Sequence, residues 1–207
     1  MNIQAGDVKK LREMTGAPMM ECKKALEESG GDPEQAIIIL RKRGQASAAQ
    51  KAGRTATQGL IGSYLHPGAQ IGVVVEVNCE TDFVARTEEF GQFVHDLAMQ
   101  ICATDPRFIR REDVPPDVLE REKEILGAQA AESGKPAAVI ARIAEGRLGK
   151  FYEENCLYEQ HFIKDQAGNT TVAELINSKI AQFGENITVR RFARFKVGEG
   201  LVKTGGA

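Results

Sequence analysis

The chain has 207 residues, enough for one large domain or for a medium domain and a small one. Apolar residues make up 42% of it and charged residues 27%, as in ordinary soluble globular proteins. The net charge of −2 differs from the strongly basic profile of a duplex nucleic-acid binder, so we expect no direct nucleic-acid partner.

Residues 3–43 predict three short helices. The first two have narrow apolar faces, formed by Val8 and Leu11 in one and by Cys22, Ala25 and Leu26 in the other. A glycine at position 16 separates these two helices, because glycine readily adopts the left-handed conformation that ends a helix.

The third helix has a clear start signal in the sequence Asp32–Gln35. Asp32 is a typical N-cap, and a proline at the first helical position costs no hydrogen bond. We expect this helix to run to about Arg43, with Gly44 as its stop.

This helical unit has more apolar surface than its own small core can bury. Ile38 and Ile39 point away from the predicted core, and Met19 and Met20 lie where the second helix begins. Methionine is flexible and suits an adaptable contact. The surplus surface packs either on the rest of the chain or on a partner, and the polar stretch that follows favours a partner.

A small, polar stretch separates the helical unit from the rest of the chain. We therefore predict a helical domain over residues 1–45, a linker over 46–59 with room for a little helix, and a core domain over 60–207.

The core domain opens with a predicted β-hairpin. Two apolar runs, residues 60–66 and 71–78, flank a Pro-Gly turn. In the second run, Ile71, Val73, Val75 and Val77 share one face, as the period of two requires. A helix follows from Thr87, with an apolar stripe formed by Phe90, Phe93, Val94, Leu97, Ala98 and Ile101.

Residues 107–183 are predicted to be mostly helical, with a turn at 134–136 and breaks near Gly146 and Gly149. A charged helix after Pro116 should turn Val118, Leu119, Ile125 and Leu126 inward. A last strand from Ile187 should place Ile187, Val189, Ala193, Phe195 and Val197 on one face and Arg190, Arg194 and Lys196 on the other, with Arg191 out of pattern.

These elements predict an α+β fold. A hairpin is unstable alone, and the last strand provides the third member of a small antiparallel sheet. Helices should cover this sheet on one face.

The sequence predicts neither a membrane segment nor an export signal. The longest apolar run, Ala36–Leu40, is far below the roughly 18 residues of a membrane helix. The first residues, MNIQAGDVKKLRE, lack the apolar core of a signal peptide. We therefore expect a cytoplasmic protein without a membrane partner.

Catalytic, cofactor and metal motifs are also missing from the sequence, so we expect a non-enzyme without cofactor or metal. The cysteines form no CxxC pair and should be small buried side chains. The sequence does not decide whether any of them forms an inter-chain disulfide. Two alternatives are a nucleic-acid module using residues 41–43, Arg190 and Arg194, and an enzyme using Cys79.

Four long motifs then resemble those of the bacterial translation elongation factor Ts family. They are VKKLREMTGAPMMECKKALEESGGD at Val8–Asp32, VEVNCETDFVAR at Val75–Arg86, LYEQHFIKD at Leu157–Asp165 and ENITVRRFARFKVGEG at Glu185–Gly200. One departure is His161, which stands where the family most often has proline.

The resemblance implies guanine-nucleotide exchange on elongation factor Tu. The expected partner is elongation factor Tu, in its GDP-bound and nucleotide-free forms. The resemblance also implies that the N-terminal three-helix domain is UBA-like. Thr81, Asp82, Phe83 and Val84 match the segment that dislocates the partner's Mg²⁺. Without the resemblance, Phe83 would be a core aromatic.

The resemblance further assigns docking on the partner to Arg12, Met19 and Met20. The chain is as short as the compact members of the family, which have a single core repeat. Those members pair into homodimers, so a homodimer is expected here.

Overall fold

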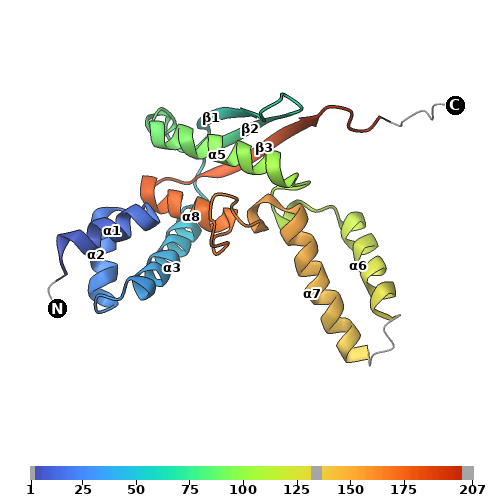
Figure 1. The fold of residues 1–207 in the computed structure, drawn as a ribbon, viewed down its shortest axis with the longest axis horizontal. Helices are drawn as coiled ribbons and strands as arrows, with labels where there is room; N and C mark the ends of the chain where they lie inside the picture. The colour runs from blue at the N-terminus through green and yellow to red at the C-terminus, as the bar shows by residue number, and fades with distance from the viewer. Residues whose placement is uncertain (1–2, 132–136, 202–207) are drawn as a thin grey trace. The chain divides into compact units, whose positions relative to one another are not determined.

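The computed structural model describes residues 3–131 and 137–201 (Figure 1). Contacts divide the chain into two compact units. The first comprises the chain up to Gly62, Glu76–Val94 and Ala173–Arg190, and the second comprises Ser63–Val75, His95–Val172 and the chain from Arg191. The predicted division at residues 45 and 59 remains a prediction.

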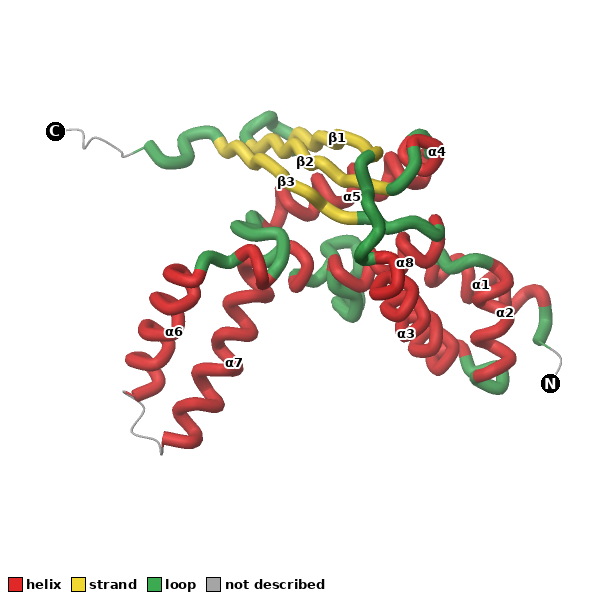
Figure 2. Tube along the Cα trace, turned by 180° about the vertical axis from the view of Figure 1, so that it is seen from behind, coloured by secondary structure: helices red, strands yellow, loops and turns green. Residues whose placement is uncertain are grey.

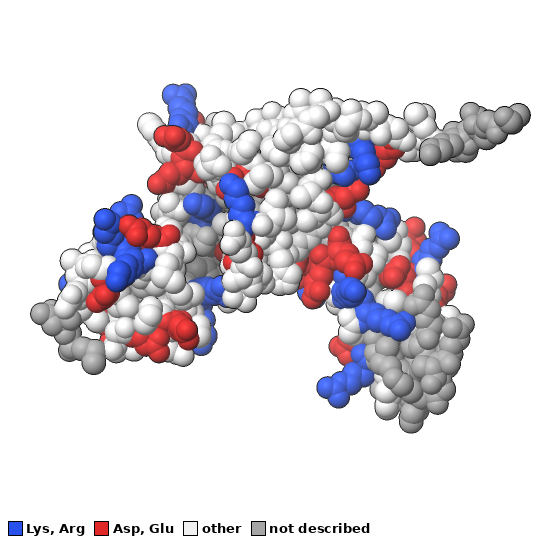
Figure 3. Space-filling model, viewed as in Figure 1, with Lys and Arg blue, Asp and Glu red and all other residues white. Residues whose placement is uncertain are grey.

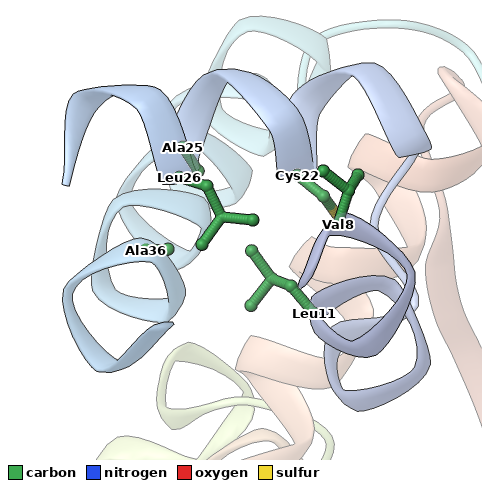
Figure 4. Close-up of a cluster of buried hydrophobic side chains, with 6 residues drawn as sticks. All are labelled: Val8, Leu11, Cys22, Ala25, Leu26 and Ala36. Atoms are coloured by element: carbon green, nitrogen blue, oxygen red, sulfur yellow. The ribbon is translucent and has the colours of Figure 1, made fainter. Parts of the chain in front are cut away.

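The N-terminal part of the first unit contains the three expected helices, α1 (Ala5–Thr15), α2 (Met19–Glu28) and α3 (Pro33–Lys51). Their side chains meet in one apolar cluster (Figure 4). It comprises the predicted inner residues of α1 and α2 together with Ala36, namely Val8, Leu11, Cys22, Ala25, Leu26 and Ala36.

The predicted helix ends are confirmed at two places. Gly16 adopts a φ of 67° and donates its N–H to the Arg12 carbonyl at 2.7 Å. The Asp32 carboxylate accepts hydrogen bonds from the backbone N–H groups of Glu34 and Gln35, at 2.9 and 3.2 Å. Both contacts satisfy backbone groups that a helix end would otherwise leave without partners.

The predicted stop of α3 at Gly44 is wrong, because the helix continues to Lys51. Gly44 and Ala48 are both buried. A Cβ on Gly44 would lie 3.6 Å from the Asn177 carbonyl oxygen of α8 (Val172–Phe183). Packing in this second half of α3 outweighs the cost of about 1 kcal/mol that glycine imposes on a helix. The predicted linker is therefore helical up to Lys51.

The sheet has the predicted three strands, β1 (Gln58–Leu65), β2 (Ile71–Cys79) and β3 (Thr188–Lys196), in the order β1-β2-β3 (Figure 2). Both pairings are antiparallel. His66 donates to the Ile71 carbonyl, and Val197 donates to the Gln70 carbonyl, each at 2.9 Å.

The alternation predicted for β2 is confirmed, since Val73, Val75 and Val77 are buried while Val74 is exposed. Helix α5 (Glu88–Thr104) is confirmed as well, and all six residues of its predicted apolar stripe are buried. Where β1 passes over α5, a Cβ on Gly62 would lie 2.4 Å from Cγ1 of Val94.

The closing strand departs from its predicted alternation. Arg190 and Arg191 are both exposed, and after them Phe192 and Arg194 take the inward side. Phe195 and Val197, predicted to share the face of Val189, are therefore 70% and 67% exposed.

The inward position of Arg194 is stabilised by polar partners. Its Nε donates to the Cys102 carbonyl at 3.4 Å, and its Nη1 lies 3.2 Å from the Asp105 carboxylate. A buried guanidinium needs such compensation for the water it loses.

The second unit contains two long helices side by side, α6 (Pro116–Ala131) and α7 (Ala137–Asn155) (Figure 1). Near their base, Val114, Phe151 and Cys156 form a buried cluster, and Val118 and Leu119 pack against it as predicted.

Two predictions for these helices are wrong. Ile125 is 44% exposed rather than inward, and α7 continues through Gly146 and Gly149 without a break. The predicted turn at 134–136 lies outside the described residues.

Gly59 yields a test of the packing between β1 and β2. Its φ is +147°, and a Cβ there would lie 2.1 Å from the Val77 carbonyl oxygen. Gly59→Ala should lower the free energy of unfolding by about 1–3 kcal/mol, as other overpacked sites do. Denaturant titration followed by circular dichroism measures this.

The matched control is Gly91→Ala in α5, where nothing lies within 4 Å of the new Cβ. This change should leave stability unchanged or raise it by up to about 1 kcal/mol. Equal stabilities of the two variants would contradict the close approach at Gly59.

Candidate functional site

The segment between β2 and α5 contains a single helical turn. Helix α4 (Asp82–Ala85) begins with Thr81 as its N-cap, whose hydroxyl accepts from the Val84 N–H at 3.4 Å. The Thr87 hydroxyl donates to the Val84 carbonyl at 2.8 Å and accepts from the Phe90 N–H at 3.2 Å. Two threonines therefore hold the turn at both ends.

Phe83 projects from this turn into solvent with 81% of its surface exposed, more than any other large apolar side chain in the described part of the chain. The alternative of a core aromatic is therefore wrong. Ala85, two residues later, is 5% exposed and anchors the turn. An exposed aromatic on an anchored turn is well placed for contact with another molecule.

Asp82 lies beside Phe83 and forms an ion pair with Arg86, with 3.0 Å between Oδ2 and Nη2. The Arg86 side chain is 80% exposed, so this pair contributes little to stability and can open. The carboxylate of Asp82 therefore stays accessible to a partner.

A second carboxylate fixes the start of the turn from the far end of the sequence. Glu185 Oε2 accepts from the N–H groups of Glu80 and Thr81, at 3.1 and 3.0 Å, and its Oε1 accepts from the Thr81 hydroxyl at 2.6 Å. In return, the Glu80 carboxylate accepts from the Asn186 N–H at 2.6 Å. We call these four hydrogen bonds the carboxylate clamp.

Cys79 lies directly before the clamp and is fully buried. Its thiol donates to the Thr81 carbonyl at 3.2 Å. Burial, and after it the nearby Glu185 carboxylate, raise the pKa of this thiol to about 11. The thiol is therefore protonated at neutral pH, which argues against the alternative of a Cys79 nucleophile.

The three residues of the predicted docking surface, Arg12, Met19 and Met20, are all exposed at the facing ends of α1 and α2. Met20 is 62% exposed and Met19 42%. Sequence reasoning missed Met14, which is 66% exposed in the last turn of α1. Its signal was a flexible apolar residue next to the turn at Gly16.

The arginines of the nucleic-acid alternative have carboxylate neighbours. Arg43 pairs with Glu21 and Glu28 at 3.0 and 2.7 Å, and Arg190 pairs with Glu76 at 2.8 Å. On the face drawn in Figure 3, Lys and Arg side chains lie among Asp and Glu rather than in a basic stripe. On that face, the described residues therefore do not form the continuous basic stripe that a phosphate backbone favours.

None of the helices in the described part of the chain combines the length and apolar character of a membrane crossing. In the same residues, no cluster of three or more His, Cys, Asp or Glu side chains could hold a metal ion.

Comparison with known proteins identifies the family. The family model described as "Elongation factor TS" matches residues 40–199. Elongation factor Ts of Caldanaerobacter subterraneus subsp. tengcongensis is 62% identical over 201 residues, covering 97% of this chain and 100% of that protein. The protein of that name from Koribacter versatilis is 61% identical over 199 residues, 96% of this chain and 90% of the relative.

A third relative, elongation factor Ts of Moorella thermoacetica, is 59% identical over 202 residues, 98% of both chains. These matches define a translation elongation factor. The chain belongs to the elongation factor Ts family.

The cysteines allow a direct test of the site's chemistry. All four are buried and free, and burial raises the pKa of each thiol, to about 11 for Cys79 and Cys156. At pH 7 a thiol with that pKa is only roughly one part in ten thousand thiolate, the form that reacts. We expect slow alkylation of the native protein and fast alkylation of all four thiols in denaturant.

Mass spectrometry after brief iodoacetamide treatment measures this reactivity, with Cys79→Ser as the comparison. One rapidly alkylated thiol in the native protein that disappears in Cys79→Ser would contradict the buried, protonated state of Cys79.

Proposed function

We propose that this protein is a guanine-nucleotide exchange factor for elongation factor Tu. It binds the GDP form in the cytoplasm, where elongation takes place, promotes GDP release and leaves when GTP enters. The observation that carries this proposal is Phe83, which is 81% exposed on a turn fixed by caps, within the part of the chain that matches the family model. The protein works through its surface and does no covalent chemistry.

The mechanism follows from linkage between the two ligands of the GTPase. GDP is held by backbone amides that cradle its phosphates and by a Mg²⁺ ion. An exchange factor must bind the nucleotide-free state better than the GDP state. By reciprocity it then weakens GDP as much as GDP weakens its own binding, about tenfold for each 1.4 kcal/mol of coupling.

Thr81, Asp82, Phe83 and Val84 carry the dislocation of the partner's Mg²⁺ in this proposal. Burial of the Phe83 ring between partner side chains contributes about 1.5–3 kcal/mol of binding free energy. This free energy offsets the cost of displacing the groups around the partner's Mg²⁺. Asp82 then perturbs the polar network that supports the Mg²⁺ without becoming a stable ligand. Its weak pairing with Arg86 is compatible with that step.

Arg12, Met19 and Met20 carry the docking, together with Met14. Their exposed methionines adapt to an apolar surface on the partner's nucleotide-binding domain. Docking contributes equally to all states of the complex and therefore sets affinity, whereas the Phe83 turn sets the maximal rate.

The protein acts as a homodimer in this proposal, with a second copy covering the open face of the sheet. In the second unit, Leu65 of β1, Val74 of β2 and Phe195 of β3 are all exposed, at 65%, 44% and 70%. Leu65 and Val74 share one face, because the Leu65 side chain lies 3.5 Å from the Cβ position of Gly72, two residues before Val74. An apolar sheet face of this kind is usually covered.

The exchange proposal is tested by GDP release from elongation factor Tu in stopped-flow fluorescence. Phe83→Ala and Asp82→Ala should each lower the maximal stimulated rate. For Phe83→Ala we expect a loss of roughly tenfold or more, because the burial energy of the ring is then no longer spent on the displacement. Circular dichroism should show an intact fold for both, since each side chain is accessible to solvent.

Two further variants separate the contributions. Replacing both Met19 and Met20 with serine should raise the concentration of this protein at which GDP release reaches half its maximal rate. The maximal rate itself should stay unchanged. Leu201→Ala, which truncates a side chain that is 78% exposed elsewhere, is the control and should change neither value. Wild-type kinetics of Phe83→Ala and Asp82→Ala would overturn the site assignment.

The dimer is tested by light scattering of a matched pair of variants. Val74→Lys should convert a particle of twice the chain mass into a monomer, because it places a charge in the apolar contact. Ile125→Lys in α6 starts from the same 44% exposure and should remain a dimer. A monomeric wild-type protein with full exchange activity would refute the homodimer.

A further inference from the structure

The carboxylate clamp differs from ordinary surface pairing in being reciprocal. Glu185 accepts two backbone N–H groups from residues 80 and 81, and Glu80 accepts the backbone N–H of Asn186. Each acidic side chain therefore satisfies the backbone of the other segment. Asn186 is 8% exposed and the Glu80 side chain 23%, so these reciprocal hydrogen bonds are largely shielded from water. Hydrogen bonds to charged acceptors are strongest under such conditions.

The clamp also determines how Thr81 caps α4. A hydroxyl has one proton, and that of Thr81 is donated to Glu185 Oε1 at 2.6 Å. Its lone pairs are then left to accept from the Val84 N–H. Glu185 thus orients the cap that starts the turn, and the turn directs the Phe83 ring.

A third segment supports the clamp from the end of the α3 region. The Arg54 guanidinium lies 3.6 Å from the Glu80 carboxylate, and the Arg54 carbonyl accepts from the Asn186 side-chain amide at 2.7 Å. All of these groups belong to the first unit, as does α4. The direction of Phe83 is therefore set by three chain segments that meet at the Thr81 cap.

We propose that Glu185 is a positioning residue for nucleotide exchange, which holds the Thr81 cap so that Phe83 enters the partner in one fixed direction. This inference rests on the proposed function. Glu185 touches no partner group in this proposal and acts through Phe83. Loss of the clamp leaves the ring exposed but free to change direction, so docking survives and the productive displacement becomes rarer.

A double-mutant cycle in the GDP-release assay tests the proposal, using Glu185→Ala, Phe83→Ala and the double variant. Glu185→Ala should lower the maximal rate by roughly tenfold with little change in the half-maximal concentration, because hydrogen bonds to a charged group are among the strongest that a side chain makes. In the Phe83→Ala background it should have no further effect, since the ring that it positions is gone.

Two additional variants guard against a purely structural explanation. Glu185→Gln keeps an acceptor without the charge and should give an intermediate rate, which provides a conservative variant if Glu185→Ala folds poorly. Glu89→Ala is the matched control, because that carboxylate also lies in the first unit but accepts from Gln182 at 3.0 Å and not from the clamp. It should exchange nucleotide like the wild type.

Hydrogen exchange adds a readout on the free protein. The amides of residues 80 and 81 should exchange faster in Glu185→Ala and keep wild-type rates in Glu89→Ala.

The outcomes distinguish this inference from the function on which it rests. A wild-type maximal rate for Phe83→Ala would overturn the proposed function itself. A lowered rate for Phe83→Ala with a wild-type rate for Glu185→Ala would overturn the positioning role alone. Equal fold-losses from Glu185→Ala in both backgrounds would show that Glu185 acts independently of Phe83, which also refutes the positioning role.

Discussion

The alternation of buried residues along β2 is the constraint on which the rest of the structure depends. Val73, Val75, Val77 and Cys79 are all buried within one strand. A shift of the strand pairing by one residue would move this whole set to the exposed face, so the register is tightly specified. Because the register fixes where β2 ends, it also fixes where Glu80 and Thr81 meet Glu185, and therefore where α4 begins.

Elements with a strong local signal were predictable from the sequence. The period of two in β2, the apolar stripe of α5 and the Asp32 cap all follow from short-range rules. The failures share a long-range cause. Gly44 stays helical because α3 packs beside α8, and Arg194 turns inward because Cys102 and Asp105 supply partners. Neither partner can be identified from the neighbouring residues in the sequence.

The candidate site shows the same limit. Physical reasoning on the sequence favoured a core role for Phe83, and only the family resemblance pointed to an exposed one. The structure places the ring outside, because the buried anchor of its turn is Ala85 instead. Glu185 opens the last of the four motifs, but nothing in the sequence indicated a role for its side chain, since an acidic residue after a glycine is typical of any surface turn. Its importance lies entirely in what it contacts across the fold.

The clamp has a consequence for the order in which the working parts become available during synthesis. Its backbone contacts join residues 104 to 106 positions apart, whereas the three N-terminal helices have a cluster that ends at Ala36. A chain emerging N-terminus first can therefore complete its helical unit early. The Thr81 cap can form only after residue 185 has been synthesised. A growing or truncated chain can therefore expose Met14, Met19 and Met20 for docking, but it cannot hold Phe83 in a fixed direction.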